Sequence, residues 1–222
     1  MSAGGVAAAG SARLDSACPE EHGFTAQFRR PHGVGGRVAG LLMAVKNRSM
    51  GRAALDALEP PPGARVLEIG FGPGALLAAL ARRRDVALVA GVDPSELMLG
   101  WARRRCRRAA RDGRLDLRLG VAESLPWPDG SFERVVAVNN FHLWSDPQKA
   151  LGEVRRVLAG GGRLVLGLRV ALPEAHRLAS PGLSDEQIAR VPPLLAAAGF
   201  RDVYVERRHV GSREAAIVAA AR

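Results

Sequence analysis

Short apolar runs alternate with segments of helical periodicity along most of the chain from residue 64 onward. Runs that are apolar on both faces are typical of buried parallel strands. We expect such strands at 65–69, 86–92, 115–119, 133–138 and 163–169. Segments with apolar residues three and four positions apart predict the intervening helices at 75–84, 95–111 and 146–158. The alternation predicts a parallel sheet that is covered by helices on both faces.

The pattern changes toward the C-terminus. A helix is predicted over 184–198, followed by two strands at 202–210 and 213–220 that only Gly211 and Ser212 separate. A two-residue connection that contains glycine is typical of a β-hairpin, so these two strands are expected to be antiparallel. The predicted fold is therefore α/β, with a Rossmann-like doubly wound sheet of seven strands that is mostly parallel and ends in an antiparallel hairpin.

The first 60 residues have a weaker pattern. Residues 1–21 are rich in Ala, Gly and Ser, and they predict a disordered tail rather than a secretory signal, because no basic segment precedes a bulky apolar one. Residues 22–60 predict a helical lid, with one or two helices over 37–58 and a break near 47–51. The remaining residues, 61–222, are expected to form one main domain.

The composition limits the classes of protein. With 222 residues, of which 47% are apolar, the chain can build one sizeable core. No apolar run reaches 18 residues, so no membrane span is predicted. Cys18 and Cys106 are too few for a disulfide framework, which fits a reducing, cytoplasmic location. His, Asp and Cys residues do not cluster at ligand spacing, so we expect no metal site.

The net charge of +10 comes almost entirely from arginine, because the chain has only two lysines. The densest arginine run is at 103–108 on the predicted helix, with Arg111 and Arg114 close behind. Such a run is typical of a solvated helix face. A nucleic-acid surface is the alternative, but no aromatic residues interleave the run to stack on bases, so we expect no nucleic-acid partner. The pattern does not indicate an oligomeric state.

A glycine-rich turn connects the first predicted strand to the following helix. Gly70, Gly72 and Gly74 leave bare backbone at a helix N-terminus, where a ligand can lie against it. The turn also fits the looser dinucleotide pattern G-x-G-x-x-G/A, so a nicotinamide-dependent oxidoreductase is one alternative and a purely structural turn is another. Glu68, inside the strand end, favours a different ligand, because its carboxylate repels a pyrophosphate and suits an ammonium group. The oxidoreductase alternative also lacks a Tyr-x-x-x-Lys relay, since Tyr204 is the only tyrosine.

A second acidic residue stands at the end of the next predicted strand. Asp93 follows Gly74 by 19 residues, a spacing at which a carboxylate can accept both hydroxyls of a ribose. The alternative is a role in starting the next helix, for which Ser95 is a suitable N-cap. The loops after the third and fourth strands, at 120–126 and 139–144, are expected to flank the same crevice, because ligands of doubly wound sheets bind at the carboxyl ends of the strands.

Together these segments resemble the class I S-adenosylmethionine-dependent methyltransferases. The resemblance is to the type 11 branch, which is similar to the ubiquinone/menaquinone-biosynthesis methyltransferases. The motifs that carry it are VLEIGFGPG at 66–74, GVD at 91–93, AESLPWPDGSF at 122–132, VNNFHLW at 138–144, and RRVL at 155–158 with GGRL at 161–164. The resemblance covers about residues 27–221. It implies an enzyme that transfers a methyl group from S-adenosyl-L-methionine to a small-molecule acceptor, with S-adenosyl-L-homocysteine as the product.

The resemblance also implies a set of cofactor-binding residues. They are Glu68, Gly70, Gly72, Gly74, Asp93, Pro94, Met98, Ala122, Glu123 and Asn139. In this assignment the glycine turn, Glu68 and Asn139 surround the methionine end, Asp93 holds the ribose hydroxyls, and the others lie beside the adenine. The family usually has an aspartate that binds the adenine amino group where this chain has Val121, so Glu123 or backbone carbonyls are expected to make that contact.

Methyl transfer from a sulfonium requires little of side chains, because the donor is already activated. In-line displacement depends on positioning, which supplies on the order of 7–11 kcal/mol in favourable cases. A hydroxyl acceptor must lose a proton, and His142, after the fourth strand, is the first candidate base. Packing or lining of the ligand site is the alternative role for His142. His32, in a glycine-rich elbow at 31–36, is the second candidate base. A methyltransferase-like scaffold with another activity is the remaining alternative.

Overall fold

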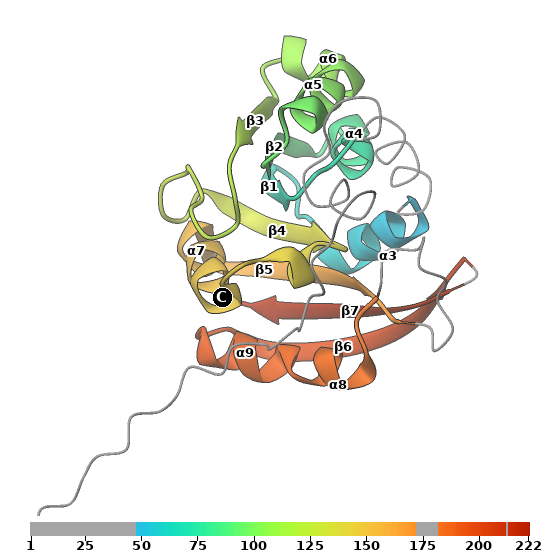
Figure 1. Ribbon diagram of the computed structural model, residues 1–222. Helices are drawn as coiled ribbons and strands as arrows, with labels where there is room; N and C mark the ends of the chain where they lie inside the picture. The colour runs from blue at the N-terminus through green and yellow to red at the C-terminus, as the bar shows by residue number, and fades with distance from the viewer. Residues whose placement is uncertain (1–47, 172–181, 212) are drawn as a thin grey trace, which may run out of the picture.

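The computed structural model describes residues 48–171, 182–211 and 213–222. Within these ranges, seven strands form one sheet in the order β3-β2-β1-β4-β5-β7-β6 (Figure 1). The strands are β1 Ala64–Ile69, β2 Val86–Asp93, β3 Leu115–Leu119, β4 Phe132–Val138, β5 Leu158–Arg169, β6 Arg201–Val210 and β7 Arg213–Ala221. The first five are parallel, and β7 lies antiparallel between β5 and β6. The predicted doubly wound sheet with an antiparallel hairpin is confirmed.

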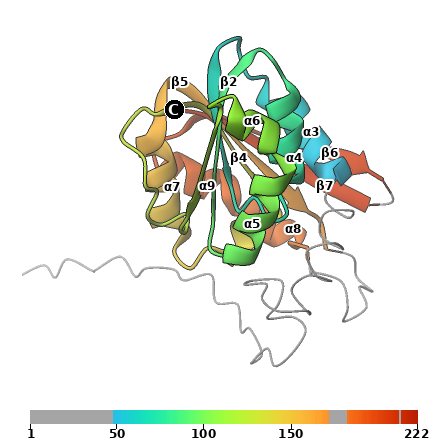
Figure 2. The ribbon, with the colours of Figure 1, turned by 90° about the horizontal axis from the view of Figure 1, so that it is seen from above.

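Helices cover both faces of the sheet, as Figure 2 shows from above. One face carries α3 Arg48–Leu58, α4 Ala75–Arg82, α5 Glu96–Arg105 and α6 Arg107–Arg111. The other face carries α7 Pro147–Val157, α8 Asp185–Ala189 and α9 Val191–Ala197. A short 3-10 helix, η1 Phe141–Leu143, follows β4. The buried side chains accordingly form two clusters, one on each face of the sheet.

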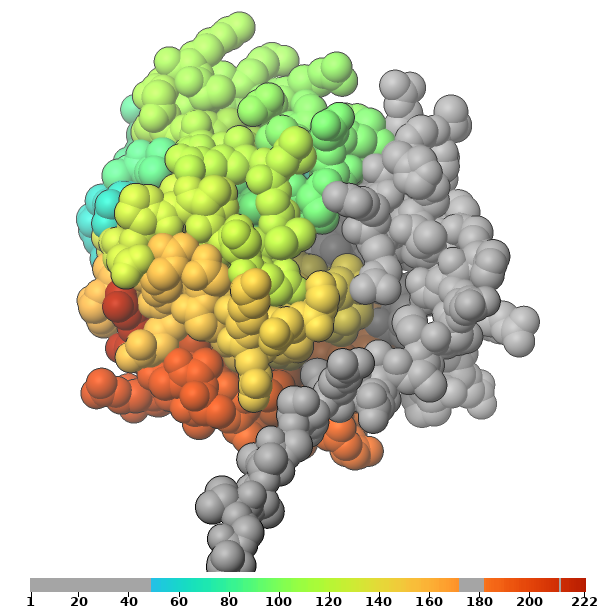
Figure 3. Space-filling view, turned by 60° about the vertical axis from the view of Figure 1, so that its left-hand side comes forward, coloured from blue at the N-terminus to red at the C-terminus, as the bar shows by residue number. Residues whose placement is uncertain are grey.

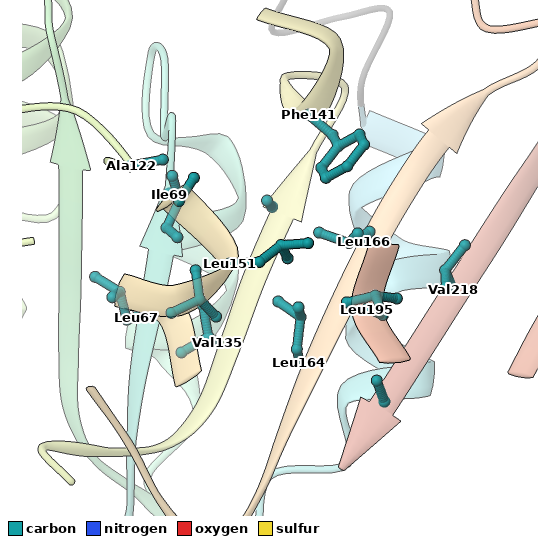
Figure 4. Close-up of a cluster of buried hydrophobic side chains, with 14 of the residues drawn as sticks. Leu67, Ile69, Ala122, Val135, Phe141, Leu151, Leu164, Leu166, Leu195 and Val218 are labelled. Atoms are coloured by element: carbon teal, nitrogen blue, oxygen red, sulfur yellow. The ribbon is translucent and has the colours of Figure 1, made fainter. Parts of the chain in front are cut away.

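The alternation of side chains along the strands builds both clusters. In β1, Leu67 points toward the cluster under α7 and α9, whereas Val66 points toward the cluster under α3, α4 and α5. Figure 4 shows Leu151 of α7 and Leu195 of α9 beside the strand side chains of the first cluster. Full burial of each such side chain contributes roughly 1.5–3 kcal/mol. A sheet covered on both faces therefore requires the apolar runs that the sequence contains.

Two predicted helices are interrupted. The helix expected over 95–111 is divided at Cys106, which leaves helical geometry and is buried. The helix expected over 184–198 is divided at Arg190, because prolines at the start of α9 have no N–H to continue the hydrogen-bond ladder. Of the break expected near 47–51, the structure describes residues 48–51, which are helical in α3; whether another helix precedes them stays a prediction.

Several predictions fall outside the described residues. They are the tail at 1–21, most of the lid at 22–60, and the candidate base His32. The described part of the predicted lid contains α3, which buries Ala54 and Leu58 completely on its face of the sheet. The boundary between lid and main domain stays a prediction.

Candidate cofactor and active site

The glycine turn between β1 and α4 follows a backbone path that favours glycine. Gly70, Gly72 and Gly74 have φ angles of 66°, 50° and 74°. A Cβ on Gly70 would lie 2.3 Å from Asn140 Nδ2, and a Cβ on Gly74 would lie 2.8 Å from Ala102 Cβ. A Cβ on Gly72 would meet no described atom within 4 Å. Gly72 therefore presents open backbone to a ligand, whereas Gly70 and Gly74 fix the turn against its neighbours.

Asp93 ends β2, and its buried carboxylate holds the glycine turn. Its Oδ2 accepts the N–H of Gly72 at 2.8 Å, and its Oδ1 accepts the N–H of Ser95 at 2.9 Å. Ser95 caps α5 as predicted, because its Oγ accepts the N–H of Met98 at 3.4 Å. Burial raises the pKa of Asp93, and the two N–H donors oppose this rise. Each carboxylate oxygen keeps a second lone pair, so a role in starting the helix and a ribose contact are compatible.

Glu68 lies one residue before the end of β1 and is only 4% exposed. Among the described residues, its Oε2 has no hydrogen-bond partner. Burial, followed by the negative charge of Asp93, raises the pKa of Glu68 well above its ordinary value, whereas the backbone N–H of Leu77 lowers it. A buried carboxylate with an unused oxygen is unfavourable unless it takes up a proton or pairs with a cation. This site therefore suits a positively charged ligand group.

A cavity of about 660 Å³ opens beside the turn, at the carboxyl edge of the sheet. Figure 3 shows the surface hollowed between the green segment that carries α5 and the yellow segment that follows β4. Predicted cofactor residues that line the cavity are Glu68, Gly70, Gly72, Asp93, Pro94, Met98, Ala122, Glu123 and Asn139. Gly74 does not line it, because it packs against α5. The volume lies within the range of about 300–1,000 Å³ that is usual for small-molecule sites.

Glu123 connects the loop after β3 to the start of α7. Its Oε1 accepts the N–H of Ser145 at 2.6 Å and the N–H of Asp146 at 3.3 Å. Val121, where the resemblance leads to the expectation of an aspartate, is 46% exposed and lines the cavity. One oxygen of Glu123 is thus already used in positioning the loop, and its expected contact with adenine stays a prediction.

The end of β4 contributes Asn140, which the sequence analysis did not name, beside the predicted Asn139. The Nδ2 of Asn140 donates to the carbonyl of Ile69 at 2.6 Å, and this side chain occupies the space that a side chain on Gly70 would need. The N–H of Arg169, at the end of β5, donates to Asn139 Oδ1 at 3.0 Å, and both residues line the cavity. The Asn-Asn pair is visible in the sequence. Its contact with a turn 70 residues earlier depends on the pairing of β1 with β4.

The candidate base His142 lies on η1 at the wall of the cavity. Its side chain is exposed, whereas that of the preceding Phe141 is buried. The ring centroids of Phe141 and Trp144 are 4.9 Å apart, so aromatic packing anchors this short helix on both sides of His142. This position places an imidazole at the same edge of the sheet as Glu68 and Asp93.

Metal ligands and membrane segments can be assessed only for the described part of the chain. There, no three His, Cys, Asp or Glu side chains are grouped so as to hold a metal ion. None of the helices described combines the length and the apolar character that a membrane crossing needs.

The fold and the site together define the class of protein. A doubly wound sheet places its ligand outside the carboxyl ends of the strands, and here the ends of β1, β2 and β4 line one cavity. The glycine turn is typical of nucleotide and nucleoside cofactors, and the buried carboxylate before it disfavours a pyrophosphate. The class is therefore a Rossmann-like enzyme for a nucleoside cofactor with a cationic amino-acid end.

Comparison with known proteins gives the same class. The family model Methyltransf_11, described as a methyltransferase domain, matches residues 67–166. The uncharacterized methyltransferase YdaC of Bacillus subtilis (strain 168) is 28% identical over 173 residues, which are 78% of this chain and 91% of that protein. Demethylmenaquinone methyltransferase of Thermus thermophilus is 42% identical over 118 residues, which are 52% of this chain and 51% of that protein. The chain thus matches about half of the length of this second relative.

A solved structure of a SAM-dependent methyltransferase from Thermotoga maritima has the same fold, with a TM-score of 0.60 and 24% identity. The match covers 85% of this chain and 95% of that one. These matches support a class I S-adenosylmethionine-dependent methyltransferase with S-adenosyl-L-methionine as its cofactor, and the structural likeness shows the shared fold. The residues present fit this molecule, because the unused Oε2 of Glu68 suits its ammonium and the open backbone at Gly72 admits a close approach.

Proposed function

We propose that this methyltransferase transfers a methyl group to a small-molecule acceptor by in-line displacement. The proposal depends most on the unused, buried Oε2 of Glu68 near the open backbone of Gly72. An ammonium group there would satisfy this oxygen and compensate its charge, whereas a pyrophosphate would be repelled. This end of the cavity therefore favours the amino-acid part of S-adenosyl-L-methionine over a dinucleotide.

The remaining cofactor contacts come from the ends of β2 and β3. Asp93 would accept the ribose hydroxyls with the lone pairs that its two N–H partners leave unused. Pro94 and Met98, at the start of α5, offer apolar surface to the adenine. Val121 places a further apolar group there, so we expect the adenine to be held by shape and by backbone groups more than by a carboxylate.

When bound, S-adenosyl-L-methionine supplies a methyl group on a sulfonium sulfur, whose bond to carbon breaks as the bond to the acceptor forms. The protein contributes positioning, which is worth on the order of 7–11 kcal/mol in favourable cases. Asp93 at the end of β2 and Asn140 after β4 hold the glycine turn from the two strands that flank β1, so the donor site is positioned before the ligand arrives. The predicted lid at 22–60 would exclude water from the reacting atoms.

The acceptor is expected to be compact and largely apolar. The apolar side chains that line the cavity besides the predicted cofactor residues include Leu55, Phe71, Leu76, Val138, Leu143 and Trp144. If the methylated atom is a hydroxyl oxygen, His142 is placed to take its proton and to pass it to solvent, because its side chain is exposed at the cavity wall. His32 of the predicted lid is the second candidate for this role.

Calorimetric titration of the full chain with S-adenosyl-L-homocysteine and with NADH tests the cofactor site. We expect the first ligand to bind and the second not to bind. Glu68→Gln should weaken S-adenosyl-L-homocysteine about tenfold or more, because a charge-assisted hydrogen bond is lost. Glu96→Gln removes an exposed carboxylate from the first turn of α5, outside the cavity, and serves as the matched control. Binding of NADH alone, or equal affinities of the two variants, would refute the site.

Acceptor transfer needs a separate measurement. Cell extract fractions of small molecules incubated with the enzyme and methyl-labelled S-adenosyl-L-methionine should yield a labelled organic product. We expect His142→Ala to slow a hydroxyl acceptor with little change in S-adenosyl-L-homocysteine affinity. Tight cofactor binding with no labelled product from any fraction would instead favour a methyltransferase-like scaffold with another activity.

A further inference from the structure

A second cavity, of about 750 Å³, lies between the end of α4 and the pair α5–α6. Figure 1 shows these three helices next to one another at one end of the sheet. We name this cavity the arginine cleft, and its lining residues are Ala78, Ala81, Arg82, Arg84, Arg105, Cys106, Arg108, Ala109, Asp112 and Arg114. The cleft combines a floor of small side chains with a rim of arginines.

Two segments with a strong excess of positive charge meet at this cleft. The segments 82–85 and 103–114 contain ten arginines and two aspartates, a net charge of +8, against +10 for the whole chain. Both aspartates already have partners: Asp85 pairs with Arg83 at 2.6 Å, and Asp112 lies 4.0 Å from Arg114. The surrounding arginines are therefore not neutralised by these acidic neighbours.

The guanidinium groups of the cleft divide into two kinds. Arg114 is structural, because it donates to the carbonyls of Ala81, Arg83 and Val86 at 3.2–3.3 Å. The other arginines of the rim form no ion pair and no side-chain hydrogen bond with the described residues; they are Arg82, Arg84, Arg105 and Arg108. Four unused donor groups around one recess are more than a solvated helix face requires.

The helix ends explain only part of this charge. The C-termini of α4 and α5 both point to this region, and each carries the equivalent of roughly half a negative charge. Two helix ends therefore compensate about one positive charge. The rest of the charge repels itself, and a bound polyanion would relieve that repulsion.

We propose that the arginine cleft binds a small, multiply charged anion that carries phosphate groups. The planar fork of a guanidinium matches phosphate oxygens in a bidentate manner, and several such groups converge on the cleft. The cavity has the volume of a small-molecule site. The small residues Ala78, Ala81 and Ala109 leave room for the anion between the arginines.

The surface near the cleft does not favour a membrane or a nucleic acid. Large apolar side chains exposed in the described residues are Leu119, Val121, Tyr204 and Val205, and none of them is on α4, α5 or α6. An interfacial helix needs such side chains for insertion between lipids. Exposed aromatic residues, which would stack on bases, are equally lacking on these helices in the part of the chain described.

The test is a calorimetric titration of the full chain with sodium tripolyphosphate at constant ionic strength, with sulfate as the reference anion. We expect tripolyphosphate to bind at least about tenfold more tightly than sulfate, because it can engage several guanidinium forks. Arg84→Gln with Arg108→Gln should weaken it about tenfold or more. The matched control is Arg103→Gln with Arg107→Gln, which removes the same charge from exposed arginines outside the cleft and should change the affinity less than about twofold.

Three results would overturn the proposal. If both double variants weaken tripolyphosphate binding equally, the anion responds to the diffuse positive field of the surface and not to a site. Tripolyphosphate binding that is no tighter than sulfate binding would show the same. Because Arg82 and Arg105 line the cofactor cavity as well, displacement of tripolyphosphate by S-adenosyl-L-homocysteine would place the anion in that cavity instead. Retention of tripolyphosphate in the presence of S-adenosyl-L-homocysteine supports a separate site.

Competition identifies the natural source of the phosphate. If ATP displaces tripolyphosphate at lower concentration than phosphatidylglycerol vesicles do, the ligand is a free nucleotide or similar phosphate ester. If the vesicles displace it first, and only from protein with Arg84 and Arg108 intact, the ligand is a lipid headgroup.

Discussion

Replacing Gly74 with alanine tests how closely the glycine turn is packed against α5. The residue has a φ angle of 74°, and a Cβ on it would lie 2.8 Å from Ala102 Cβ and 2.9 Å from Ala102 Cα. The second of these atoms belongs to the backbone of a helix and cannot rotate away. Alanine at this position must therefore move either the turn or α5.

Two contributions set the expected size of the effect. Left-handed backbone disfavours a residue with a Cβ by roughly 1–2 kcal/mol. Overpacking of a close contact adds about 1–3 kcal/mol. We therefore expect Gly74→Ala to lower the free energy of unfolding by roughly 2–5 kcal/mol. Gly113→Ala is the matched control, because its φ of 69° is similar and no described atom lies within 4 Å of its Cβ position, so only the first contribution applies.

Urea unfolding followed by circular dichroism measures both variants, with the free energy obtained by linear extrapolation. In a protein of this size, each 1 kcal/mol corresponds to about 2–4 °C in Tm. Gly74→Ala should be less stable than Gly113→Ala by about 1–3 kcal/mol, the contribution of the contact with α5. Equal losses in the two variants would refute the close packing of the turn on α5.

Three further predictions concern side chains around the turn and below α5. Asn140→Ala removes the donor to the Ile69 carbonyl and should lower the free energy of unfolding by about 1–3 kcal/mol. The same variant should bind S-adenosyl-L-homocysteine more weakly, as measured by calorimetry. The pKa of Glu68 is raised in the folded protein. The contribution of Glu68 to the free energy of unfolding is therefore complete below its unfolded pKa and is lost as the pH rises through its folded pKa. Glu68→Gln should flatten the pH dependence of the free energy of unfolding, measured by urea unfolding. Burial and the charge of Glu68 raise the pKa of Cys106 to about 11, so in a Cys18→Ser background this thiol should react with Ellman's reagent only on unfolding.

Each of these has a clear contrary result. Unchanged cofactor affinity in Asn140→Ala would show that the turn keeps its shape without this donor. Parallel stability curves for Glu68→Gln and the unsubstituted protein would contradict a raised pKa at Glu68. Rapid modification of Cys106 in native protein, at a rate that denaturant does not increase, would contradict its burial.

The fold could be predicted from the sequence because its strands differ in burial. β1 to β5 are covered on both faces and therefore read as continuous apolar runs, apart from the less buried β3. β6 is largely exposed at the edge of the sheet, and it was the short glycine connection to β7 that predicted it. The interruption at Arg190 is marked in the sequence by Pro192 and Pro193, which the single helix predicted over 184–198 did not take into account. The interruption at Cys106 has no such proline or glycine signal.

The site was predictable only as far as local motifs reach. Glu68, the glycine turn and Asp93 stand at strand ends, and parallel pairing brings such ends together. The role of Asn140 depends on a contact between β4 and a turn 70 residues earlier, for which the sequence has no local signal. The arginine cleft forms because the end of α4 lies beside α6. The two arginine runs are separate in the sequence, and only the folded structure brings them together.

The position of β7 has a consequence for synthesis of the protein. This strand comes last in the described sequence, yet it lies inside the sheet and pairs with both β5 and β6. Until residues 213–221 emerge from the ribosome, the earlier strands therefore present an open, apolar edge to other nascent chains. Unpaired edges of this kind invite aggregation. Chaperone demand should consequently persist until β7 has been synthesised, and it should increase with any substitution that delays closure of the β6–β7 hairpin.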